Sequence, residues 1–327
     1  NMYNVAVIAG GDSGEYEVSM RSGAMVTKCI DNTKFNPYMV EISSKGWWVL
    51  IGDQKYNIDK NDFSFQLDGK KIKFDVVYNI IHGTPGEDGK IQGYLDMLKL
   101  PYTSPGLSCC AITMNKAVSK AIVGAMGLPV AKSVVLQRGK GYAAEEVINK
   151  TSLPVFVKPN SGGSSVATHK VYDLKDFKTA VDDAFQHDAE VICEEYVQGM
   201  EITGGVFFDG SALICLPITE IVPHHDFFDY KAKYLGESDE ITPARIDESL
   251  KNKVNELTKK IYRILNCEGL VRIDFIIKES EPYFMEVNTI PGFSEQSIVP
   301  QQIRAAGMNE KDVITMLIMQ AINGKKS

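Results

Sequence analysis

The sequence predicts an α/β fold with more than one domain, on three observations. Short apolar runs that alternate with polar residues, as strands do, recur between longer amphipathic segments typical of helices. The chain has 327 residues, which is enough for two or three domains with ample cores. Two alternating runs, Gly269–Ile277 and Pro282–Gly292, are joined by the short turn Lys278–Glu281 and predict an antiparallel hairpin.

Residues 2–104 are expected to form an N-terminal α/β domain. The buried strand Val5–Ala9 leads through a glycine-rich turn into a helix near Val18–Asp31. Further strands are predicted at Tyr38–Ile42, Trp47–Ile51 and Val76–Ile81.

Residues 105–195 are expected to form a central domain. Its first helix is predicted at Lys116–Met126, with Thr113 and Asn115 as candidate caps at the N-terminal side. The remaining elements expected here are the strands Ser133–Leu136 and Val155–Lys158 and the helix Leu174–His187.

Residues 196–327 are expected to form a C-terminal domain with several strands, a helix at Leu250–Leu265, the hairpin and an amphipathic helix after Asn309. The stretch from about 223 to 243 shows little periodicity, and long loops of this kind are usually functional lids or disordered segments. Its aromatic and basic side chains favour a lid: His224, His225, Tyr230, Lys231, Lys233 and Tyr234.

Composition excludes several classes of protein. The net charge of −7 and the absence of a basic stripe argue against a nucleic-acid or membrane surface as partner. No run of 18 apolar residues is present, and the first strand begins without a basic segment or cleavage site before it. The six cysteines lack metal-binding spacing and are typical of free thiols in a reducing compartment, so we expect a cytoplasmic protein.

The hairpin predicts a metal site. With its turn centred on Ser280, Asp274 lies opposite Glu286 and Arg272 opposite Asn288, all on one face. Two facing carboxylates repel each other, and a divalent cation between them would remove that conflict. Carboxylate and amide oxygens suit Mg²⁺ or Mn²⁺ rather than zinc. The alternative is a pair of solvated strands whose charges have no function.

A second candidate site is the loop Asn160–Val166, which follows the strand ending at Lys158. Its glycines allow close backbone approach, successive N–H groups can surround an anion, and Lys158 adds a positive charge. An ordinary hairpin turn with an exposed lysine is the alternative. Neither this loop nor Gly10-Gly11 matches the common P-loop or dinucleotide patterns.

Three further segments are ambiguous when each is taken alone. The strand end Ile192–Glu201 could present carboxylates to a purine and ribose, or could simply be solvated. Glu15 and Ser19 open a helix, where such residues serve as caps. The loop His82–Gly89 follows a strand, where open α/β sheets bind ligands, but a single histidine there is as often structural.

The order of these segments resembles the ATP-grasp superfamily and, within it, the D-alanine–D-alanine ligase family. The motifs that carry the resemblance span nearly the whole chain: Gly10–Ser19, His82–Gly93, Met114–Lys116, Val157–Pro159, Gly163–Val166, Phe228–Tyr234, Arg272–Asp274 and Glu286–Gly292. The resemblance implies a three-domain ATP-grasp architecture in which an N-terminal open α/β domain lies on the substrate side.

The resemblance also implies the activity. Two D-alanines would be joined for peptidoglycan synthesis through a D-alanyl phosphate, with ATP as co-substrate and two Mg²⁺ or Mn²⁺ ions, in a homodimer. The alternative is a ligase that joins D-alanine to D-serine or D-lactate, although Tyr234 favours the dipeptide. A regulatory nucleotide-binding module would be expected to lack one of the charged groups, and a dehydrogenase would need the dinucleotide pattern missing here.

Residue roles follow from the matched motifs. Glu15 would hold the ammonium of the first D-alanine, hydrogen-bonded to Ser164 and Tyr234, and His82 would lie near its carboxylate. Arg272, Ser297 and the Gly292 N–H would receive the carboxylate of the second. The residues expected at ATP are Lys116, Lys158, Ser165, Glu194, Glu195, Val197, Glu201 and Lys233, and those at the metal ions are Asp274, Glu286 and Asn288.

Three positions depart from the family pattern without removing a catalytic group. Ala167 stands where the family commonly has glycine, Phe228 where it often has tyrosine, and Tyr16 fills a variable position.

Overall fold

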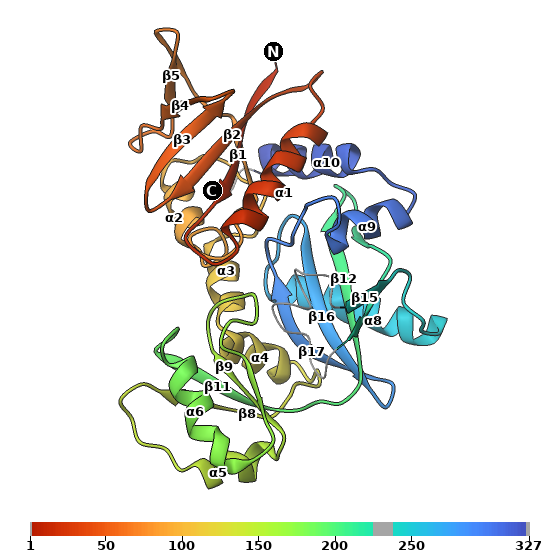
Figure 1. The fold of residues 1–327 in the computed structure, drawn as a ribbon. Coiled ribbons are helices and arrows are strands. Elements are labelled where there is room, and N and C mark those ends of the chain that lie inside the picture. The colour runs from red at the N-terminus through yellow and green to blue at the C-terminus, as the bar shows by residue number, and fades with distance from the viewer. Residues whose placement is uncertain (1, 225–237, 325–327) are drawn as a thin grey trace.

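The computed structural model describes residues 2–224 and 238–324. Its described residues form three sheets of four or more strands, each packed against helices, and a separate two-stranded ribbon. Figure 1 shows one sheet near the N-terminus, a second around β9 and β11, and a third around β12, β16 and β17. The α/β class predicted from the sequence is therefore confirmed.

The first sheet has the strand order β4-β3-β2-β1-β7. The strand β1 runs parallel to β2 and β7, because the helix α1 carries the chain back across the sheet. All four strands and the helix predicted for this region are present. The elements of this region are β1 (Tyr3–Gly10), α1 (Tyr16–Cys29), β2 (Phe35–Ser43), β3 (Gly46–Ile51), β4 (Gln54–Asn57), the ribbon β5 (Phe65–Leu67) and β6 (Lys70–Ile72), β7 (Val76–Asn79) and α2 (Lys90–Met97).

The second sheet is antiparallel, in the order β10-β9-β11-β8. Two helices cover it, and the buried Phe177 packs with Val155 and Val191 in their shared core. The predicted strands are confirmed, and the last helix ends three residues before the predicted His187. The elements are β8 (Ser133–Gln137), α5 (Ala144–Thr151), β9 (Val155–Pro159), β10 (His169–Val171), α6 (Leu174–Ala184) and β11 (Glu190–Glu195).

The third sheet follows the order β15-β14-β12-β16-β17, with β13 paired to β12. The helices α3 and α4 pack on β17, and α8 packs on β12 and β13. The part of the stretch 223–243 from Ser238 to Ile241 is a strand, so the predicted loop is too long at that end. The elements are α3 (Leu107–Met114), α4 (Lys116–Ala125), β12 (Met200–Phe208), β13 (Leu213–Cys215), β14 (Thr219–Pro223), β15 (Ser238–Ile241), α8 (Glu248–Ile264), β16 (Val271–Lys278), β17 (Glu281–Asn288) and α9 (Ile298–Ala305).

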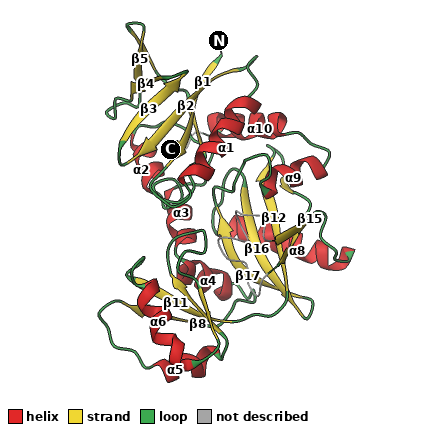
Figure 2. Cartoon of the chain, viewed as in Figure 1, coloured by secondary structure: helices red, strands yellow, loops and turns green. Residues whose placement is uncertain are grey.

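The last helix, α10 (Glu310–Asn323), returns to the first sheet. Figures 1 and 2 show it beside α1. Its buried Val313 and Leu317 share one apolar cluster with Val7 and Val26. The N-terminal core is thus completed by residues from the far end of the chain. Among the described residues, every helix is too short or too polar to cross a membrane.

One of the two predicted caps of α4 is wrong. Asn115 Oδ1 accepts a hydrogen bond from the Val118 N–H at 3.0 Å, which confirms Asn115 as the cap. Thr113 instead lies inside α3 and donates to the Cys109 carbonyl at 2.8 Å. The sequence did not reveal α3 because an eight-residue helix contains barely two turns of periodic pattern.

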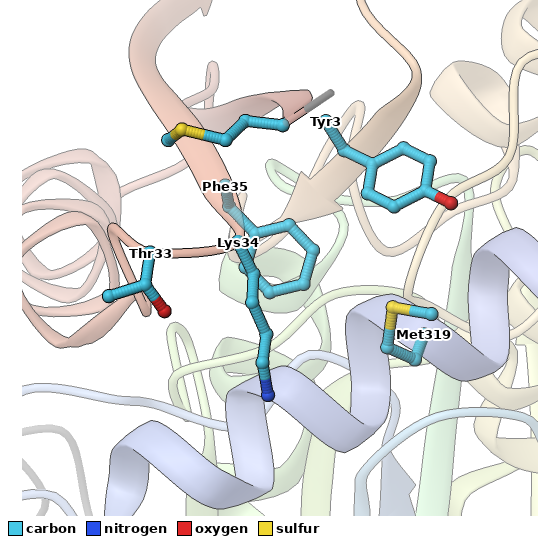
Figure 3. Close-up of a pocket in the computed structure, with 6 residues that line it drawn as sticks. Tyr3, Thr33, Lys34, Phe35 and Met319 are labelled. Atoms are coloured by element: carbon cyan, nitrogen blue, oxygen red, sulfur yellow. The ribbon is translucent and has the colours of Figure 1, made fainter.

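A surface hollow of about 450 Å³ lies where β1, β2 and α10 meet. Figure 3 shows the side chains that surround it. None of the residues that the sequence nominates for ATP, D-alanine or metal is among its lining residues, which are Met2, Tyr3, Thr33, Lys34, Phe35 and Met319.

Gly269 fixes the entry to the hairpin. Its backbone is left-handed, with φ +65°, and a Cβ atom there would lie 2.0 Å from the Thr103 carbonyl oxygen. Gly127 has a similar backbone, with φ +83°, but a Cβ atom would meet nothing within 4 Å. The two glycines therefore have similar backbone conformations and differ in the space available for a side chain.

We expect Gly269→Ala to lower the free energy of unfolding by about 3 kcal/mol or more, because strain and a backbone clash act together. Gly127→Ala carries the strain alone and should cost about 1–2 kcal/mol. Chemical denaturation of both variants measures the difference, and equal losses would contradict the close approach at Thr103.

Candidate active site

The hairpin places the predicted charged residues on one face. Asp274 pairs with Glu286, and Arg272 pairs with Asn288, as the sequence predicts. The turn, however, is the residue pair Glu279-Ser280, both with positive φ, and is not centred on Ser280.

A β-bulge restores the predicted pairing. Phe275 pairs with Phe284 while Asp274 pairs with Glu286, so Met285 is an extra residue in β17. Without it, Glu286 would lie opposite Ile273, which is fully buried, and its carboxylate would face the core. The bulge is therefore what brings Glu286 onto the face of Asp274.

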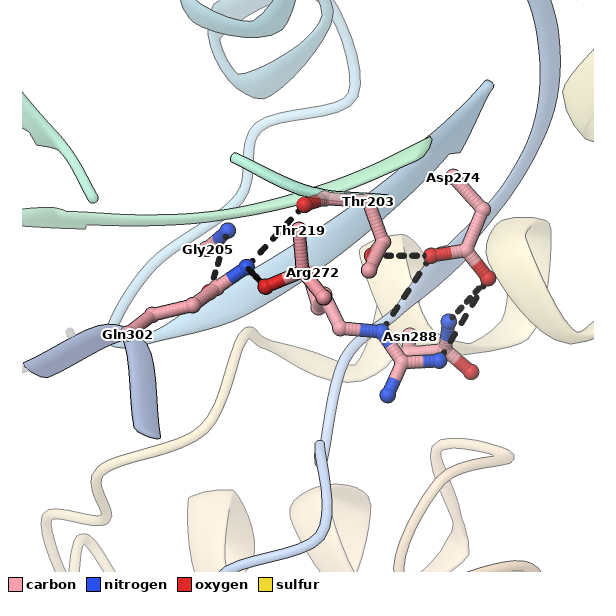
Figure 4. Close-up of polar contacts among 7 residues, drawn as sticks. All are labelled: Thr203, Gly205, Thr219, Arg272, Asp274, Asn288 and Gln302. Atoms are coloured by element: carbon pink, nitrogen blue, oxygen red, sulfur yellow. Dashed lines mark hydrogen bonds and ion pairs between the residues drawn. The ribbon is translucent and has the colours of Figure 1, made fainter. Parts of the chain in front are cut away.

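Asp274 is the centre of a hydrogen-bond network, shown in Figure 4. Its Oδ1 accepts from Thr203 Oγ1 at 2.5 Å and from Arg272 Nε at 3.2 Å. Its Oδ2 accepts from Asn288 Nδ2 at 3.1 Å and from an Arg272 terminal nitrogen at 3.4 Å. These contacts hold the Arg272 guanidinium beside the hairpin, with 14% of its side chain exposed.

A second hydrogen-bond network, centred on Gln302 of α9, holds the backbone of Thr203. The buried Gln302 of α9 donates from Nε2 to the Thr203 carbonyl and to Thr219 Oγ1, both at 3.0 Å. Its Oε1 accepts from the Gly205 N–H at 3.1 Å. Figure 4 shows both groups of contacts side by side, so α9 orients the strand that supplies the Asp274 partner.

The donor set on this face fits a divalent cation. Asp274 and Glu286 offer carboxylate oxygens, and the Asn288 amide presents oxygen instead of nitrogen after a half-turn about its terminal bond. That half-turn also releases one acceptor position on Asp274. Within residues 2–224 and 238–324 no three His, Cys, Asp or Glu side chains gather as a metal site, so the amide would have to complete the set.

Three charged side chains meet between α4 and the second sheet. Lys158 Nζ lies 2.5 Å from Glu194 Oε1, and Lys120 forms an ion pair with Glu194 Oε2. Lys120 and Glu194 are 3% and 2% exposed. Burial and the neighbouring Lys158 charge lower the pKa of Lys120 well below its ordinary value. Glu194 and Lys158 were expected at ATP, whereas Lys120 was missed.

The loop Asn160–Val166 is hydrogen-bonded to the start of α4. Lys116 Nζ donates to the Gly162 carbonyl at 2.6 Å, and its own N–H donates to the Asn160 carbonyl at 3.0 Å. The buried Asn160 also accepts from the Ala117 N–H and donates to Asn115. The predicted ATP residues Lys116 and Lys158 therefore border the same loop.

The loop also approaches Glu15, the residue just before α1. A Cβ atom on Gly163 would lie 3.3 Å from Glu15 Oε2. Ser164 is 6% exposed, and within the described part of the chain its hydroxyl forms no hydrogen bond, including none to Glu15. Ser164, Ser165 and Ala167 all have positive φ, a backbone conformation in which glycine is the least strained residue.

Side chains from α1 and from the segment after β7 hold the turn after β17. His82 Nδ1 lies 2.8 Å from the Ile290 carbonyl oxygen, and Ser22 Oγ accepts from the Phe293 N–H at 3.0 Å. Glu87 accepts from the Ile290 N–H at 3.3 Å, and burial with the Glu15 charge raises its pKa to about 8. Gly292 lies within this turn, and a Cβ atom there would lie 3.1 Å from Ser297 Oγ.

The residues expected at adenine, Glu195 and Val197, have only part of their polar groups available for a nucleotide. Glu195 donates its N–H to the Lys132 carbonyl and accepts the Lys132 N–H on Oε1, both at 2.9 Å. Val197 is buried, and Glu201 lies on β12 opposite Ile276. The predicted site residues Lys233 and Tyr234, and the family-pattern position Phe228, lie outside the described residues.

Four residues that contact the site were not predicted from the sequence: Ser22, Glu87, Lys120 and Thr203. Lys120 lies four residues after Lys116, so both lie on one side of α4, and a lysine among the buried positions Ser119 and Val123 was the available signal. Ser22 and Glu87 act on backbone more than 200 residues away, and the sequence carries no local sign of such contacts.

Comparison with known proteins shows which family the chain resembles along its length. Family models described as D-ala D-ala ligase N-terminus and D-ala D-ala ligase C-terminus match residues 4–105 and 122–319. The D-alanine–D-alanine ligase of Phocaeicola vulgatus is 46% identical over 316 residues, covering 96% of this chain and 98% of that protein.

Two solved structures are similar over nearly their whole length. The VanG D-Ala:D-Ser ligase from Enterococcus faecalis has a TM-score of 0.87 and 32% identity, covering 98% of this chain and 99% of its own. The D-alanine–D-alanine ligase from Bacillus anthracis complexed with ATP has a TM-score of 0.79 and 28% identity, covering 99% of both. The chain therefore belongs to the D-alanine–D-alanine ligase family.

Proposed function

We propose that the site described above joins two D-alanines into D-alanyl-D-alanine for peptidoglycan synthesis, with ATP as co-substrate and a D-alanyl phosphate as intermediate. The ATP-dependent ligase activity follows from membership of the family. The observation that supports this proposed function is the match of both family models across the chain, together with 46% identity to a D-alanine–D-alanine ligase.

In the first step, a carboxylate oxygen of the first D-alanine attacks the γ-phosphorus of ATP, and the bond to the ADP oxygen breaks. Negative charge on the transferring group must be balanced by cations placed in advance. We assign this to Lys116, Lys158, Lys233 and Arg272. The oxygens of Asp274, Glu286 and Asn288 would hold two Mg²⁺ or Mn²⁺ ions, which neutralise phosphate charge when bound.

In the second step, the amine nitrogen of the second D-alanine attacks the acyl carbon. The tetrahedral intermediate carries an oxyanion, to which Arg272 and the Gly292 N–H donate. Phosphate then leaves with the electron pair of the acyl–oxygen bond, and the new amide nitrogen loses a proton. Arg272 thus serves both steps, and its hydrogen bonds to Asp274 keep it in place for each.

We assign the two substrates to the residues that the family resemblance implies. Glu15 would hold the first ammonium, with the hydroxyls of Ser164 and Tyr234 as its hydrogen-bond partners once substrate is bound; Gly163, next to Ser164, already approaches the Glu15 carboxylate. Arg272, Ser297 and the Gly292 N–H receive the second carboxylate. The short distance between Gly292 and Ser297 supports their joint action.

The nucleotide enters beside the Lys158–Glu194 ion pair. We assign Ser165 to the phosphates, Glu195 and Val197 to adenine through their backbone, and Glu201 to ribose. Phosphate oxygens would attract Lys158, which leaves one Glu194 oxygen to accept from the adenine amine. Lys120 then remains as the partner that keeps Glu194 charged in its buried position.

The acylphosphate reacts readily with water, so the site must close during turnover. We assign closure to the segment between Pro223 and Ser238, which are paired across β14 and β15, and to the Gly162–Ser165 loop. We further propose the three domains 2–104, 105–195 and 196–327, a homodimer and a cytoplasmic location.

Product analysis tests the proposed function. The chain is incubated with ATP and Mg²⁺ plus D-alanine, L-alanine or no amino acid, and phosphate release is measured. In further arms D-alanine is mixed with D-serine or D-lactate, because the VanG enzyme is named as a D-Ala:D-Ser ligase. D-Ala-D-Ala should be the main product; a D-serine or D-lactate product in its place would contradict the proposal.

Arg272→Ala should lower kcat by about 10²–10³-fold, because it removes charge stabilisation that operates in both transition states. Arg245→Ala is the matched control, since Arg245 pairs at 2.7 Å with the buried Glu220 of β14, which lies two strands away from β16 in the same sheet. That control should lose stability and keep its kcat. Steady-state kinetics separate the two, and near-normal kcat in Arg272→Ala would refute its assignment.

Glu15→Gln should raise KM for the first D-alanine about 10–100-fold and leave KM for ATP nearly unchanged. A lost hydrogen bond to a charged group costs about 1.5–3 kcal/mol. The control is Glu17→Gln, an exposed position two residues along the chain. Equal effects on both KM values would show that Glu15 does not hold the ammonium.

A further inference from the structure

The turn Ile290–Phe293 is held at both ends by side chains from another part of the chain. At its start, His82 Nδ1 contacts the Ile290 carbonyl at 2.8 Å. At its end, the Phe293 N–H donates to Ser22 Oγ at 3.0 Å. Ser22 and His82 also contact each other, with 3.1 Å between Oγ and Nε2.

The directions of these hydrogen bonds are determined by their partners. The Ile290 carbonyl only accepts, so His82 carries its hydrogen on Nδ1. Burial lowers the pKa of His82, so the ring is neutral and its Nε2 can only accept a hydrogen bond. Ser22 Oγ, which accepts from the Phe293 N–H, therefore gives its own hydrogen to Nε2.

This arrangement leaves His82 without a nitrogen for a ligand. Its side chain is 3% exposed, and each ring nitrogen already has a protein partner. Ser22 is fully buried and uses both its hydrogen and an acceptor position. Neither side chain is placed to hold a D-alanine carboxylate directly.

We propose that Ser22 and His82 are positioning residues for the second step of the ligation, which fix the Gly292 N–H through the main chain on either side of it. The inference rests on the proposed function and replaces the expected contact between His82 and the first D-alanine. The turn is stiff between its two supports, because Pro291 has a fixed φ and no N–H.

Such support matters because an oxyanion donor contributes fully only when it already points at the developing charge. The side chains of Ile290 and Phe293 are buried, so the two supports act on a turn that is anchored in the core. Loss of one support would let the Gly292 peptide plane rotate while the fold remains.

A loosened turn should separate the two steps of the reaction. Phosphoryl transfer would continue, but the acylphosphate would wait longer for the second amine. Water would then attack the acyl carbon, phosphate would leave, and D-alanine would be regenerated. The ratio of phosphate to dipeptide, which is one for a coupled enzyme, therefore reports on the turn.

The experiment compares Ser22→Ala with Ser19→Ala. Both serines are fully buried on α1, one helical turn apart. Ser19 accepts from the Gly10 N–H at 2.9 Å and donates to the Ile80 carbonyl at 2.8 Å, within the N-terminal domain. With ATP and D-alanine, Ser22→Ala should lose about tenfold in dipeptide kcat and raise the phosphate-to-dipeptide ratio above two. Ser19→Ala should keep a ratio of one.

His82 provides the second arm. Asparagine can place its amide nitrogen near the position of Nδ1, so His82→Asn should restore part of the coupling that His82→Ala loses. If Ser22→Ala does not fold, the ratio is measured on Ser22→Cys, which keeps the volume and weakens the hydrogen bond.

The outcomes are distinguishable. A ratio of one in both the Ser22 and His82 variants, with only a lower melting temperature, overturns the positioning role. Equal uncoupling in Ser19→Ala also overturns it, because the effect would then be a general result of losing a buried hydroxyl. If the unmodified chain forms no dipeptide from D-alanine, the proposed function itself fails.

Discussion

The candidate site depends on one extra residue in β17. Hairpin side chains alternate strictly between two faces, so the insertion of Met285 reverses the alternation for every residue beyond it. Glu286 and Asn288 then share a face with Arg272 and Asp274, while Val287 points to the core. The effect of Met285 extends beyond the end of β17, because the register of this strand sets the direction in which the following turn, which contains Gly292, leaves the sheet.

The burial of two charged side chains is the second constraint on the structure of the site. Removing Lys120 and Glu194 from water is costly, and that cost is offset only while each faces the other. The pair also connects α4 with β11, and Lys158 on β9 completes it. The side to which we assign the nucleotide therefore contains a preformed group of charges, whereas the side to which we assign the D-alanines is organised mainly by hydrogen bonds to backbone.

Much of the fold could be predicted because its longer elements have clear periodicity. The strands β1, β2 and β9 and the helices α8 and α10 occupy segments that the sequence had marked. The register of the hairpin was also correct at Asp274, although its turn was misplaced. The spacing of three between Phe284 and Val287, both buried, was the overlooked sign of the bulge.

The rest of the site could not be predicted, for physical reasons. A charged residue such as Lys120 is normally exposed, so its burial becomes visible only once Glu194 is beside it. Contacts such as Ser22 with Phe293 depend on how distant parts of the chain pack, and local pattern carries no information on that packing.

The position of α10 has a consequence for synthesis of the chain. Proteins made on the ribosome generally fold from the N-terminus as each domain emerges. Here Val7 and Val26 are covered partly by Val313 and Leu317, so the first sheet lacks part of its core until the segment that contains those two residues has been made. The nascent first sheet therefore exposes an apolar surface until α10 emerges from the ribosome, and chaperones that recognise such surfaces can bind it in that interval.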